Sequence, residues 1–473
     1  MKKPIFKNKL ILAASVLMAL AASMIFLISI AGRKPQPNII LMSIDTLRAD
    51  HLHCYGYPFP TSPNIDAYSE DSVVFENAVS QSPVTASAHM SLFTGLTPIV
   101  HGVTNLGREP NQNNRLDDSV PTLAEILKNE GYYTVGFHEG GNVSSVLGFD
   151  KGFDLYSSEH INWQNIEETN VLAGIRTWIN KSKTDSKPLH LFLHHYICHD
   201  PYLSAPENFR LHFLKNRVPE IPVENTVINK EFFYVRDAFW KNVDMTKEAH
   251  KQHVIALYDG AVYYSDYIFG KVMDLLKEED IYDNSMVILL SDHGEEFFEH
   301  GDTLHWRLFI ESLHVPFMIK FPASEYGGTR IKQKIRTFDL LPSLLQYLGI
   351  KGVNVMQSTT FLPLLNKRGE YDPLIKSFSG DLRYIRFVEN EFIYSNQPSH
   401  GYSEWLFNQS NDPKELENLA NVDEQSLTHM KFESRKLMRK EVTIKNKLQL
   451  WGKTPAKVNS KLMEQLKALG YIK

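Results

Sequence analysis

The chain has 473 residues, 43% of them hydrophobic, and carries a formal net charge of −5. This length allows one large domain and a smaller one, and the hydrophobic content is ordinary for a globular protein. Charged residues form no long run of one sign, so the sequence indicates no nucleic-acid partner.

The N-terminal 34 residues differ from the rest of the chain. Four lysines lie among residues 1–9, and an uncharged, mostly apolar segment follows at 10–32. A helix needs about 20 such residues to cross a bilayer, and the lysines would stay on the cytoplasmic side. We therefore expect an uncleaved anchor in the cell membrane, with the remaining chain outside the cytoplasm. The alternative is a signal peptide cleaved after Ala31, which would leave a secreted or periplasmic protein.

Three apolar runs have the form of buried parallel strands, and each meets polar residues at its carboxyl end. They lie at 37–45, 190–196 and 285–294. Helical patterns lie between them, at 122–131 and at 251–280. This alternation predicts an α/β fold with a large, mostly parallel sheet and helices on both of its faces. Ligand sites in such sheets lie beyond the carboxyl ends of the strands.

The last hundred residues have a different pattern. Residues 383–395 are typical of a short hairpin, and two charged segments after residue 436 have helical patterns. We therefore expect a smaller α+β subdomain at 376–473 that ends in a helical tail.

The chain contains two cysteines, Cys54 and Cys198. Two cysteines in a chain of this size do not make a disulfide framework. We expect both to be free, although an oxidising compartment would allow one bridge.

Two acids and a histidine follow two of the predicted strands. Asp45 ends the first strand, and Asp292 and His293 end the third. Because the fold brings the carboxyl ends of the strands together, these three groups can form one divalent-metal site. Gly294 permits a tight turn that points both preceding side chains to the same place. The alternative interpretation is that the acids cap helices or pair with arginines.

Residues 85–95, TASAHMSLFTG, are typical of a helix that begins near Thr85 or Ser87. A hydroxyl at a helix N-terminus faces backbone N–H groups and the positive end of the helix dipole, which suits an anionic ester. An ordinary N-cap threonine is the alternative. A threonine hydroxyl is a weak nucleophile, so it needs activation by a metal or a base.

Five segments, in this order along the chain, resemble segments of one known family. They are 38–103, SDHGEEFFEHG at 291–301, HVPFMIKFP at 314–322, TFDLLPSLLQYLGI at 337–350 and LFNQSNDPKELENLA at 406–420. The family is the sulfatases, within the alkaline phosphatase superfamily. The resemblance implies an alkaline-phosphatase-like sandwich. From the resemblance together with the patterns at the two ends of the chain, we expect a membrane anchor or signal segment at 1–34, a catalytic domain at 35–375 and the C-terminal subdomain at 376–473.

The chain departs from the pattern of the family that it resembles at its nucleophile and at one metal ligand. The family has a cysteine or serine where this chain has Thr85, a proline at Ser87 and an arginine at His89. In the family this cysteine or serine is oxidised to formylglycine, which threonine cannot form. The resemblance therefore implies that Thr85 acts as the metal-bound threonine does in relatives that act on phosphate esters. Thr46 replaces a second acid. The remaining ligands favour Mn²⁺ or Zn²⁺, with Ca²⁺ as the alternative. They are Asp45, Thr85, Asp292 and His293.

Four further residues match family positions near the ester. His199 matches a histidine that contacts the ester or protonates the leaving oxygen. Asn105 matches an asparagine that binds a non-bridging oxygen in some relatives. His305 lies where the family has a cationic residue that faces the leaving group, with Arg307 as a competing candidate. His138 matches another family histidine.

These residues predict a metal-dependent hydrolase that acts on sulfate or phosphate esters through Thr85. The expected partner is therefore an anionic ester substrate. One alternative is a transferase that moves a phosphoryl-linked group at the membrane surface. The other is a binding protein that kept the fold and lost its activity, although a dead site has no physical need to keep metal ligands. The histidines of residues 51–53 are interpreted as structural.

Overall fold

The protein is described here by a computed structural model. It covers residues 36–106, 114–159, 161–167, 170–224, 232–352, 356–366, 370–399, 401–450, 456 and 458–468. Residues Asn38–Lys473 form one unit and Met1–Pro37 another. The boundary predicted at 375/376 stays a prediction. Cys54 and Cys198 are both free, as predicted.

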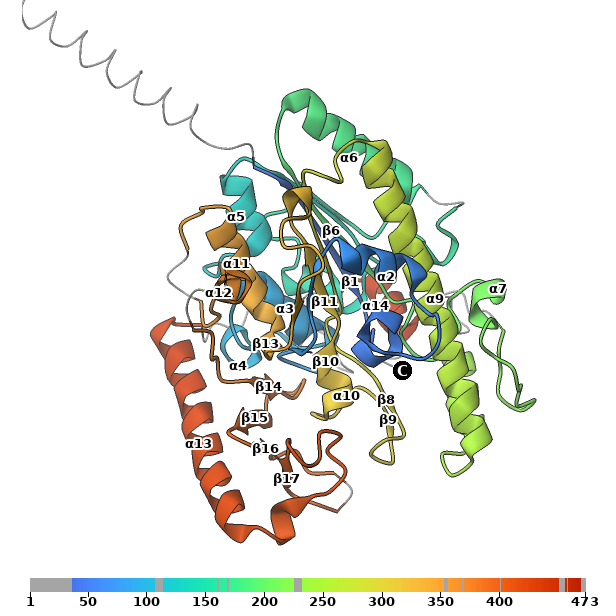
Figure 1. The fold of residues 1–473 in the computed structure, drawn as a ribbon, viewed down its shortest axis with the longest axis vertical. Coiled ribbons are helices and arrows are strands. Elements are labelled where there is room, and N and C mark those ends of the chain that lie inside the picture. The colour runs from blue at the N-terminus through green and yellow to red at the C-terminus, as the bar shows by residue number, and fades with distance from the viewer. Residues whose placement is uncertain are drawn as a thin grey trace, which may run out of the picture. The chain divides into compact units, whose positions relative to one another are not determined.

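An eight-stranded mixed sheet lies at the centre of the larger unit, in the order β12-β2-β11-β7-β1-β6-β4-β5 (Figure 1). Its strands are β1 (Asn38–Ile44), β2 (Val73–Phe75), β4 (Tyr133–Phe137), β5 (Leu155–Ser157), β6 (Leu189–His195), β7 (Ser285–Leu290), β11 (Phe317–Lys320) and β12 (Arg330–Ile331). The central strand β1 pairs in parallel with β6 and with β7, whereas β11 is antiparallel to β7 and β2. The predicted large, mostly parallel sheet is therefore confirmed, and the carboxyl ends of β6, β1 and β7 lie side by side.

Helices cover both faces of this sheet (Figure 1). One face carries α3 (Thr85–Thr94), α5 (Leu123–Asn129) and α11 (Leu340–Tyr347), and the other carries α2 (Pro63–Glu70), α6 (Val171–Asp185) and α9 (Glu248–Glu278). The pleat of β1 divides its side chains between these layers. Ile40 and Met42 pack into the α9 core, whereas Ile39 and Leu41 pack into the α3 core. Burial on both faces explains why this strand is a continuous apolar run.

The connections contain shorter elements. The helices are α4 (Pro98–His101), α7 (Glu207–Arg210), α8 (Phe232–Asn242), α10 (Ile310–Leu313), α12 (Leu362–Asn366) and α14 (Ser460–Ala468). The 3₁₀ helices are η1 (Ala49–His51), η2 (His53–Tyr55), η4 (Gly141–Val143), η5 (Ser145–Leu147), η6 (Trp163–Asn165), η7 (Pro322–Ser324), η8 (Thr337–Asp339) and η9 (Leu419–Asn421). The short strands are β3 (Ala78–Val79), β8 (Glu296–Phe297), β9 (Thr303–Leu304), β10 (His314–Val315) and β13 (Ile335–Arg336).

The C-terminal part contains a four-stranded antiparallel sheet in the order β14-β15-β16-β17, at the lower left of Figure 1. Its strands are β14 (Lys376–Phe378), β15 (Ile385–Glu389), β16 (Phe392–Ser395) and β17 (Trp405–Asn408). The predicted hairpin at 383–395 is the β15–β16 pair. Helix α13 (Glu424–Lys447) packs against this sheet and begins well before the segment predicted to be helical.

Glu441 joins α13 to the rest of the molecule. Its side chain is fully buried and forms an ion pair with Lys376 on β14. The same carboxylate accepts hydrogen bonds from Thr97 Oγ1 at 2.5 Å and from Gln357 Nε2 at 2.8 Å. Burial lowers the pKa of Lys376, and the negative charge of Glu441 opposes that shift. The ammonium of Lys376 therefore depends on this carboxylate.

We expect Glu441→Gln to lower the free energy of unfolding by about 3 kcal/mol, because the buried ammonium of Lys376 would lose its counter-charge. Glu433→Gln is the matched control on the same helix, since Glu433 pairs with an exposed lysine, Lys436. This control should cost less than about 0.5 kcal/mol. Denaturant unfolding of both variants measures the difference, and equal losses would contradict the role of Glu441.

No helix within the described ranges is long and apolar enough to cross a membrane. The longest of them, α9, carries charged residues along its length. The segment 10–32, from which an anchor was predicted, lies outside the described residues. We therefore correct the prediction of a single-pass membrane protein with its catalytic domain outside the cytoplasm, and the membrane is not retained as a partner.

Candidate active site

The first acid of the site follows the central strand β1. Asp45 is fully buried, and its backbone N–H donates a 3.1 Å hydrogen bond to the carbonyl oxygen of His195 at the end of β6. The chain then turns at Thr46, whose φ of 56° is uncommon for a residue with a side chain. Tyr258 on α9 donates its hydroxyl to the Thr46 carbonyl oxygen at 2.8 Å. The turn that presents Asp45 is therefore held by the helix layer beneath it.

Asp292 and His293 follow β7, the other neighbour of β1. The next residue is glycine because its backbone lies against another segment: a Cβ at Gly294 would lie 2.0 Å from the carbonyl oxygen of Glu311. Its φ is not in the left-handed region, so close packing and not the predicted tight turn requires the glycine. His293 Nδ1 donates to the Gly294 carbonyl oxygen at 3.0 Å. The lone pair of His293 is therefore on Nε2, as a metal ligand requires.

Thr85 is the first residue of α3, and Val84 is the N-cap. This position excludes the interpretation of Thr85 as an ordinary N-cap. Its Oγ1 donates to Asp45 Oδ2 at 3.2 Å and lies 3.4 Å from His293 Nε2. Ser87, the alternative start, instead donates its hydroxyl to the carbonyl oxygen of Val103. The helix therefore begins so that the Thr85 hydroxyl meets the acid and the imidazole.

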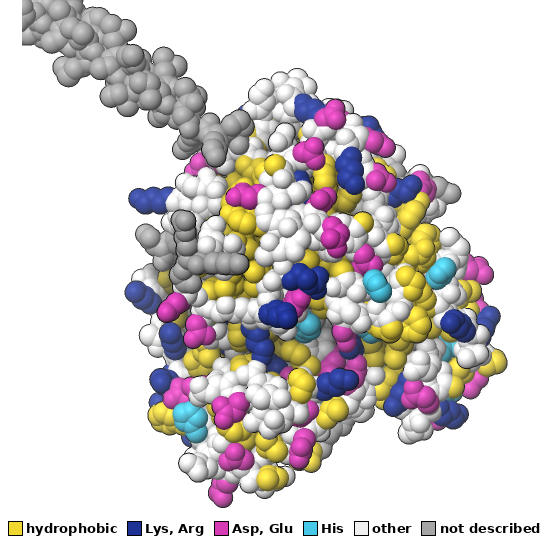
Figure 2. Space-filling model, viewed as in Figure 1, with side chains coloured by type: hydrophobic (Ala, Val, Ile, Leu, Met, Phe, Trp, Pro, Cys, Tyr) yellow, Lys and Arg dark blue, Asp and Glu magenta, His cyan; other side chains and the backbone are white. Residues whose placement is uncertain are grey.

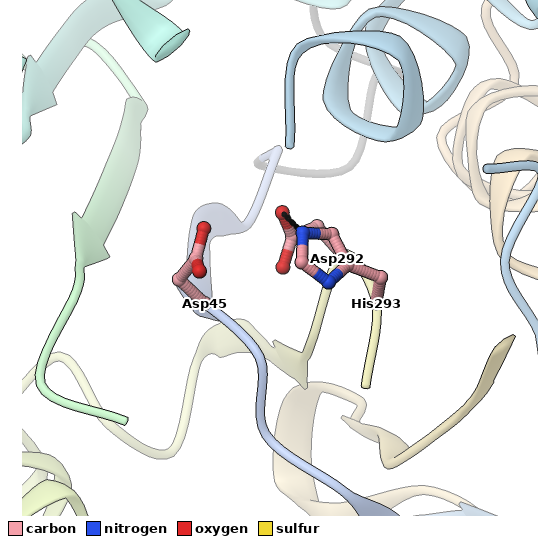
Figure 3. A group of neighbouring side chains, drawn as sticks. All are labelled: Asp45, Asp292 and His293. Atoms are coloured by element: carbon pink, nitrogen blue, oxygen red, sulfur yellow. Dashed lines mark ion pairs between the residues drawn. The ribbon is translucent and has the colours of Figure 1, made fainter. Parts of the chain in front are cut away.

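Asp45, Asp292 and His293 form a compact group of potential metal ligands. Their ligand atoms all lie within 4.8 Å of one another, and Figure 3 shows the Asp45 carboxylate opposite the other two side chains. Zinc bonds of about 2.0–2.1 Å to four tetrahedral ligands separate neighbouring ligand atoms by about 3.3 Å. Thr85 Oγ1 is 3.4 Å from His293 Nε2, and that nitrogen is 3.4 Å from Asp292 Oδ2. The spacing therefore fits a small divalent cation.

The two carboxylates of this group lie close together inside the protein. Burial and the charge of Asp45 raise the pKa of Asp292 well above its usual value. Burial opposes ionisation of Asp45 too, but His194, His293 and His199 hold its pKa below the usual range. Within the described part of the chain, Asp45 Oδ1 and Asp292 Oδ2 accept no hydrogen bond. Two buried carboxylates with these open oxygens match the donor set of a divalent cation.

Two buried imidazoles surround the acids. His89 Nδ1 donates to the Thr85 carbonyl oxygen at 3.0 Å and lies 3.4 Å from Asp292 Oδ2. His194 on β6 has Nε2 at 3.7 Å from Asp45 Oδ2, and its ring centroid is 4.9 Å from that of His89. Burial lowers the pKa of His89 to about 3, so it is neutral where the family resemblance expects a cationic arginine. The sequence identified His89 only as the residue that stands where the resembled family has an arginine, and it predicted no role for His194.

His305 and His199 lie on the same side of the site. The His305 ring stacks on that of His293 at 4.3 Å and is 5.5 Å from the ring of His199. His305 Nδ1 donates to the Pro83 carbonyl oxygen at 2.9 Å. His199 Nδ1 lies 3.1 Å from the carbonyl oxygen of Asp200 and 3.2 Å from its carboxylate. Both imidazoles are therefore oriented by their Nδ1 contacts.

The other predicted residues contribute less directly. Asn105 Oδ1 accepts a 2.7 Å hydrogen bond from the Ala86 N–H, so it provides a partner for one of the backbone N–H groups in the first turn of α3. Arg307, the alternative to His305, forms an ion pair with Glu296. His138 stacks on Tyr156 at 4.1 Å, and its Nδ1 accepts from the Gly140 N–H. The contacts of these last two side chains therefore lie away from the three-residue metal group.

The alkaline-phosphatase-like sheet and the metal-compatible group at its carboxyl edge define an ester hydrolase of the alkaline phosphatase superfamily. The chain belongs to the sulfatase family, because the sulfatase family model matches residues 37–350, more than half of its length. An arylsulfatase of Clostridium perfringens is 24% identical over 454 residues, covering 82% of this chain and 91% of the relative.

Solved structures show the same fold. A phosphonate monoester hydrolase of Agrobacterium radiobacter is 19% identical with a TM-score of 0.65, covering 86% of this chain and 96% of that one. A protein solved with its substrate D-glucosamine-2-N,6-O-disulfate has the same TM-score at 17% identity, with coverage of 87% and 98%. The fold thus occurs with both sulfur and phosphorus esters.

We expect the full-length protein to bind one divalent cation, and Asp292→Asn to weaken that binding by at least about 100-fold. Thr85→Ala should still bind the ion, because both carboxylates and the imidazole remain. Calorimetric titration with Zn²⁺ and with Mn²⁺ measures these affinities. Asp118→Asn is the matched control, since the Asp118 side chain is 83% exposed. An equal loss in that variant would contradict the assignment.

Proposed function

We propose that this chain hydrolyses a sulfuric or phosphoric ester with Thr85 as its nucleophile. The observation that carries the proposal is the position of the Thr85 hydroxyl, 3.2 Å from Asp45 Oδ2 and 3.4 Å from His293 Nε2. Membership of the sulfatase family supports ester hydrolysis. The names of the arylsulfatase and phosphonate monoester hydrolase relatives support an anionic ester at sulfur or phosphorus.

The site would hold one divalent cation. Asp45, Asp292 and His293 would bind it together with Thr85, and Zn²⁺ or Mn²⁺ is favoured over Ca²⁺ because an imidazole is among the ligands. When bound, such a cation supplies Lewis-acid polarisation of the ester and stabilises the ionised form of a neighbouring hydroxyl.

Thr85 performs the first displacement. The 3.2 Å hydrogen bond to Asp45 Oδ2 orients its hydroxyl, whose proton is released to water. Oγ1 then forms a bond to sulfur or phosphorus as the bond to the alcohol oxygen breaks. His89 Nδ1 donates to the Thr85 carbonyl oxygen and so stabilises the first turn of α3. The product alcohol leaves, and the acid group remains esterified to Thr85.

Two histidines have different proton-transfer roles in this proposal. His199 is oriented by Asp200 and protonates the departing alcohol oxygen. Burial lowers the pKa of His305 to about 4, so this imidazole is neutral near pH 7. Because its Nδ1–H is bonded to Pro83, His305 Nε2 carries the lone pair and accepts a proton from the water that hydrolyses the Thr85 ester. The oxygen of that water forms the new bond to sulfur or phosphorus as the bond to Oγ1 breaks, and Oγ1 takes a proton from solvent to regenerate Thr85. His305 then releases its proton to solvent, and His199 takes one up for the next cycle.

The open carboxylate oxygens argue against an inactive binding protein. A site that only preserved the fold would gain stability by replacing Asp45 and Asp292 with neutral groups, since uncompensated buried charge is costly.

Thr85→Ala is expected to lower kcat by at least about 1,000-fold, because the attacking oxygen is removed. Thr85→Ser keeps a hydroxyl at the same position and should retain far more activity. Steady-state hydrolysis by the metal-loaded, full-length protein measures both. Equal activity of Thr85→Ala and the unmodified protein would exclude Thr85 as nucleophile.

The ester class is tested with four 4-nitrophenyl substrates: a sulfate, a phosphate monoester, a phosphate diester and a phosphonate monoester. We expect at least one to be hydrolysed, and the preferred one to lose kcat/KM on His199→Gln through slower departure of the alcohol. Replacing 4-nitrophenol by an alcohol of higher pKa should enlarge that loss. A loss that did not depend on the leaving alcohol would contradict the role of His199.

A further inference from the structure

Helix α8 contacts the neighbour of the proposed proton donor, although no motif in its sequence indicates a function. Its Phe239 is fully buried in the apolar cluster that also contains residues of α9. Hydrophobic side chains gather along α9 on the face of the molecule drawn in Figure 2. Arg236 and Trp240 are four residues apart, so they lie on one face of α8. The packing of Phe239 therefore fixes where that face points.

The Asp200 carboxylate receives both of these side chains. Its Oδ2 accepts from Arg236 Nε at 2.5 Å and from Trp240 Nε1 at 3.0 Å. The Asp200 side chain is 1% exposed and that of Arg236 is 16% exposed, so this is not a solvated surface pair. Burial opposes ionisation of Asp200, but Arg236 and His199 hold its pKa below the usual value. The carboxylate is therefore charged and is held by two donors from one helix.

Asp200 in turn orients the imidazole of His199. His199 Nδ1 donates to the Asp200 carbonyl oxygen at 3.1 Å and lies 3.2 Å from Oδ1 of the same residue. Both of these oxygens are acceptors, so Nδ1 carries a proton. The proton transfer that we propose for His199 then uses Nε2. The two carboxylate oxygens of Asp200 thus have different neighbours, since Oδ2 meets α8 and Oδ1 meets the imidazole.

We propose that Arg236 and Trp240 are positioning residues that act on His199 through Asp200. The role of His199 in this inference rests on the proposed function, whereas the contacts of Asp200 do not. Without the two donors at Oδ2, the buried carboxylate would turn toward other partners, and the imidazole beside Oδ1 would lose its fixed orientation. Misplacing a catalytic group by about 1 Å costs about 100-fold in rate.

Steady-state hydrolysis by the metal-loaded, full-length protein tests the proposal with Arg236→Gln and Trp240→Phe. For an ester of an alcohol of high pKa, we expect Arg236→Gln to lower kcat/KM by about 10- to 100-fold, and Trp240→Phe to lower it less. The 4-nitrophenyl ester should lose much less, because its leaving group needs little protonation. Lys241→Gln, which removes an exposed charge from the same helix, should change neither rate.

A double variant separates positioning of His199 from a general structural role. Arg236→Gln should slow the His199→Gln protein by less than about twofold, because Arg236 acts only through that ring. Its Zn²⁺ affinity, measured by calorimetry, should equal that of the unmodified protein. Additive losses in the double variant, or equal losses for both leaving alcohols, would overturn the inference. Trp240→Phe keeps an aromatic ring in place, so it tests the same point if Arg236→Gln does not fold.

Nuclear magnetic resonance of protein with ¹⁵N-labelled histidine observes the ring without any ester. The His199 signals are those that disappear in His199→Gln. We expect a proton on Nδ1 in the unmodified protein and in Lys241→Gln, and altered ring signals in Arg236→Gln and Trp240→Phe. An unchanged His199 ring in both α8 variants would contradict the positioning role. An altered ring in a protein that hydrolyses no ester would reject the proposed function and leave the positioning of His199 intact.

Discussion

Two buried carboxylates at adjacent strand ends are the constraint on which the site depends. Asp45 and Asp292 follow β1 and β7, which pair in parallel, so the sheet brings their charges together inside the protein. Like charges in a low-dielectric interior repel strongly, and burial together with the charge of Asp45 raises the pKa of Asp292. A bound cation would relieve this repulsion, whereas the neutral His89 beside the acids does not. The Thr85 hydroxyl lies beside these groups, where a bound cation would stabilise its ionised form.

Much of the fold could be predicted because its strongest signals are local. A strand that is buried on both faces is a mostly apolar run, and β1 and β7 have that form, whereas the buried β6 also contains three histidines. The acids and His293 could be placed at one sheet edge because parallel strands end together. The start of α3 at Thr85 followed from its polar beginning and its glycine stop. These predictions needed no knowledge of which distant side chains meet.

The remaining features depend on register and on contacts between distant segments. His194 reaches Asp45 because it pairs with Ser43 across the β1–β6 ladder, and a sequence pattern does not fix that register. Gly294 is needed because of Glu311, on a different segment. Asp259 accepts hydrogen bonds from His51 and Tyr57, which lie 208 and 202 residues earlier in the chain, so no single motif could indicate these contacts.

The pairing of β1 with β7 also limits how the metal preference of this protein can change. Neighbouring strands are held about 4.8 Å apart by their backbone hydrogen bonds, whatever side chains they carry. The two acids follow these strands within one or two residues, so the pairing fixes where the segments that carry them begin. A side chain of another length, such as glutamate in place of aspartate, would change the space between the carboxylates without moving these strands.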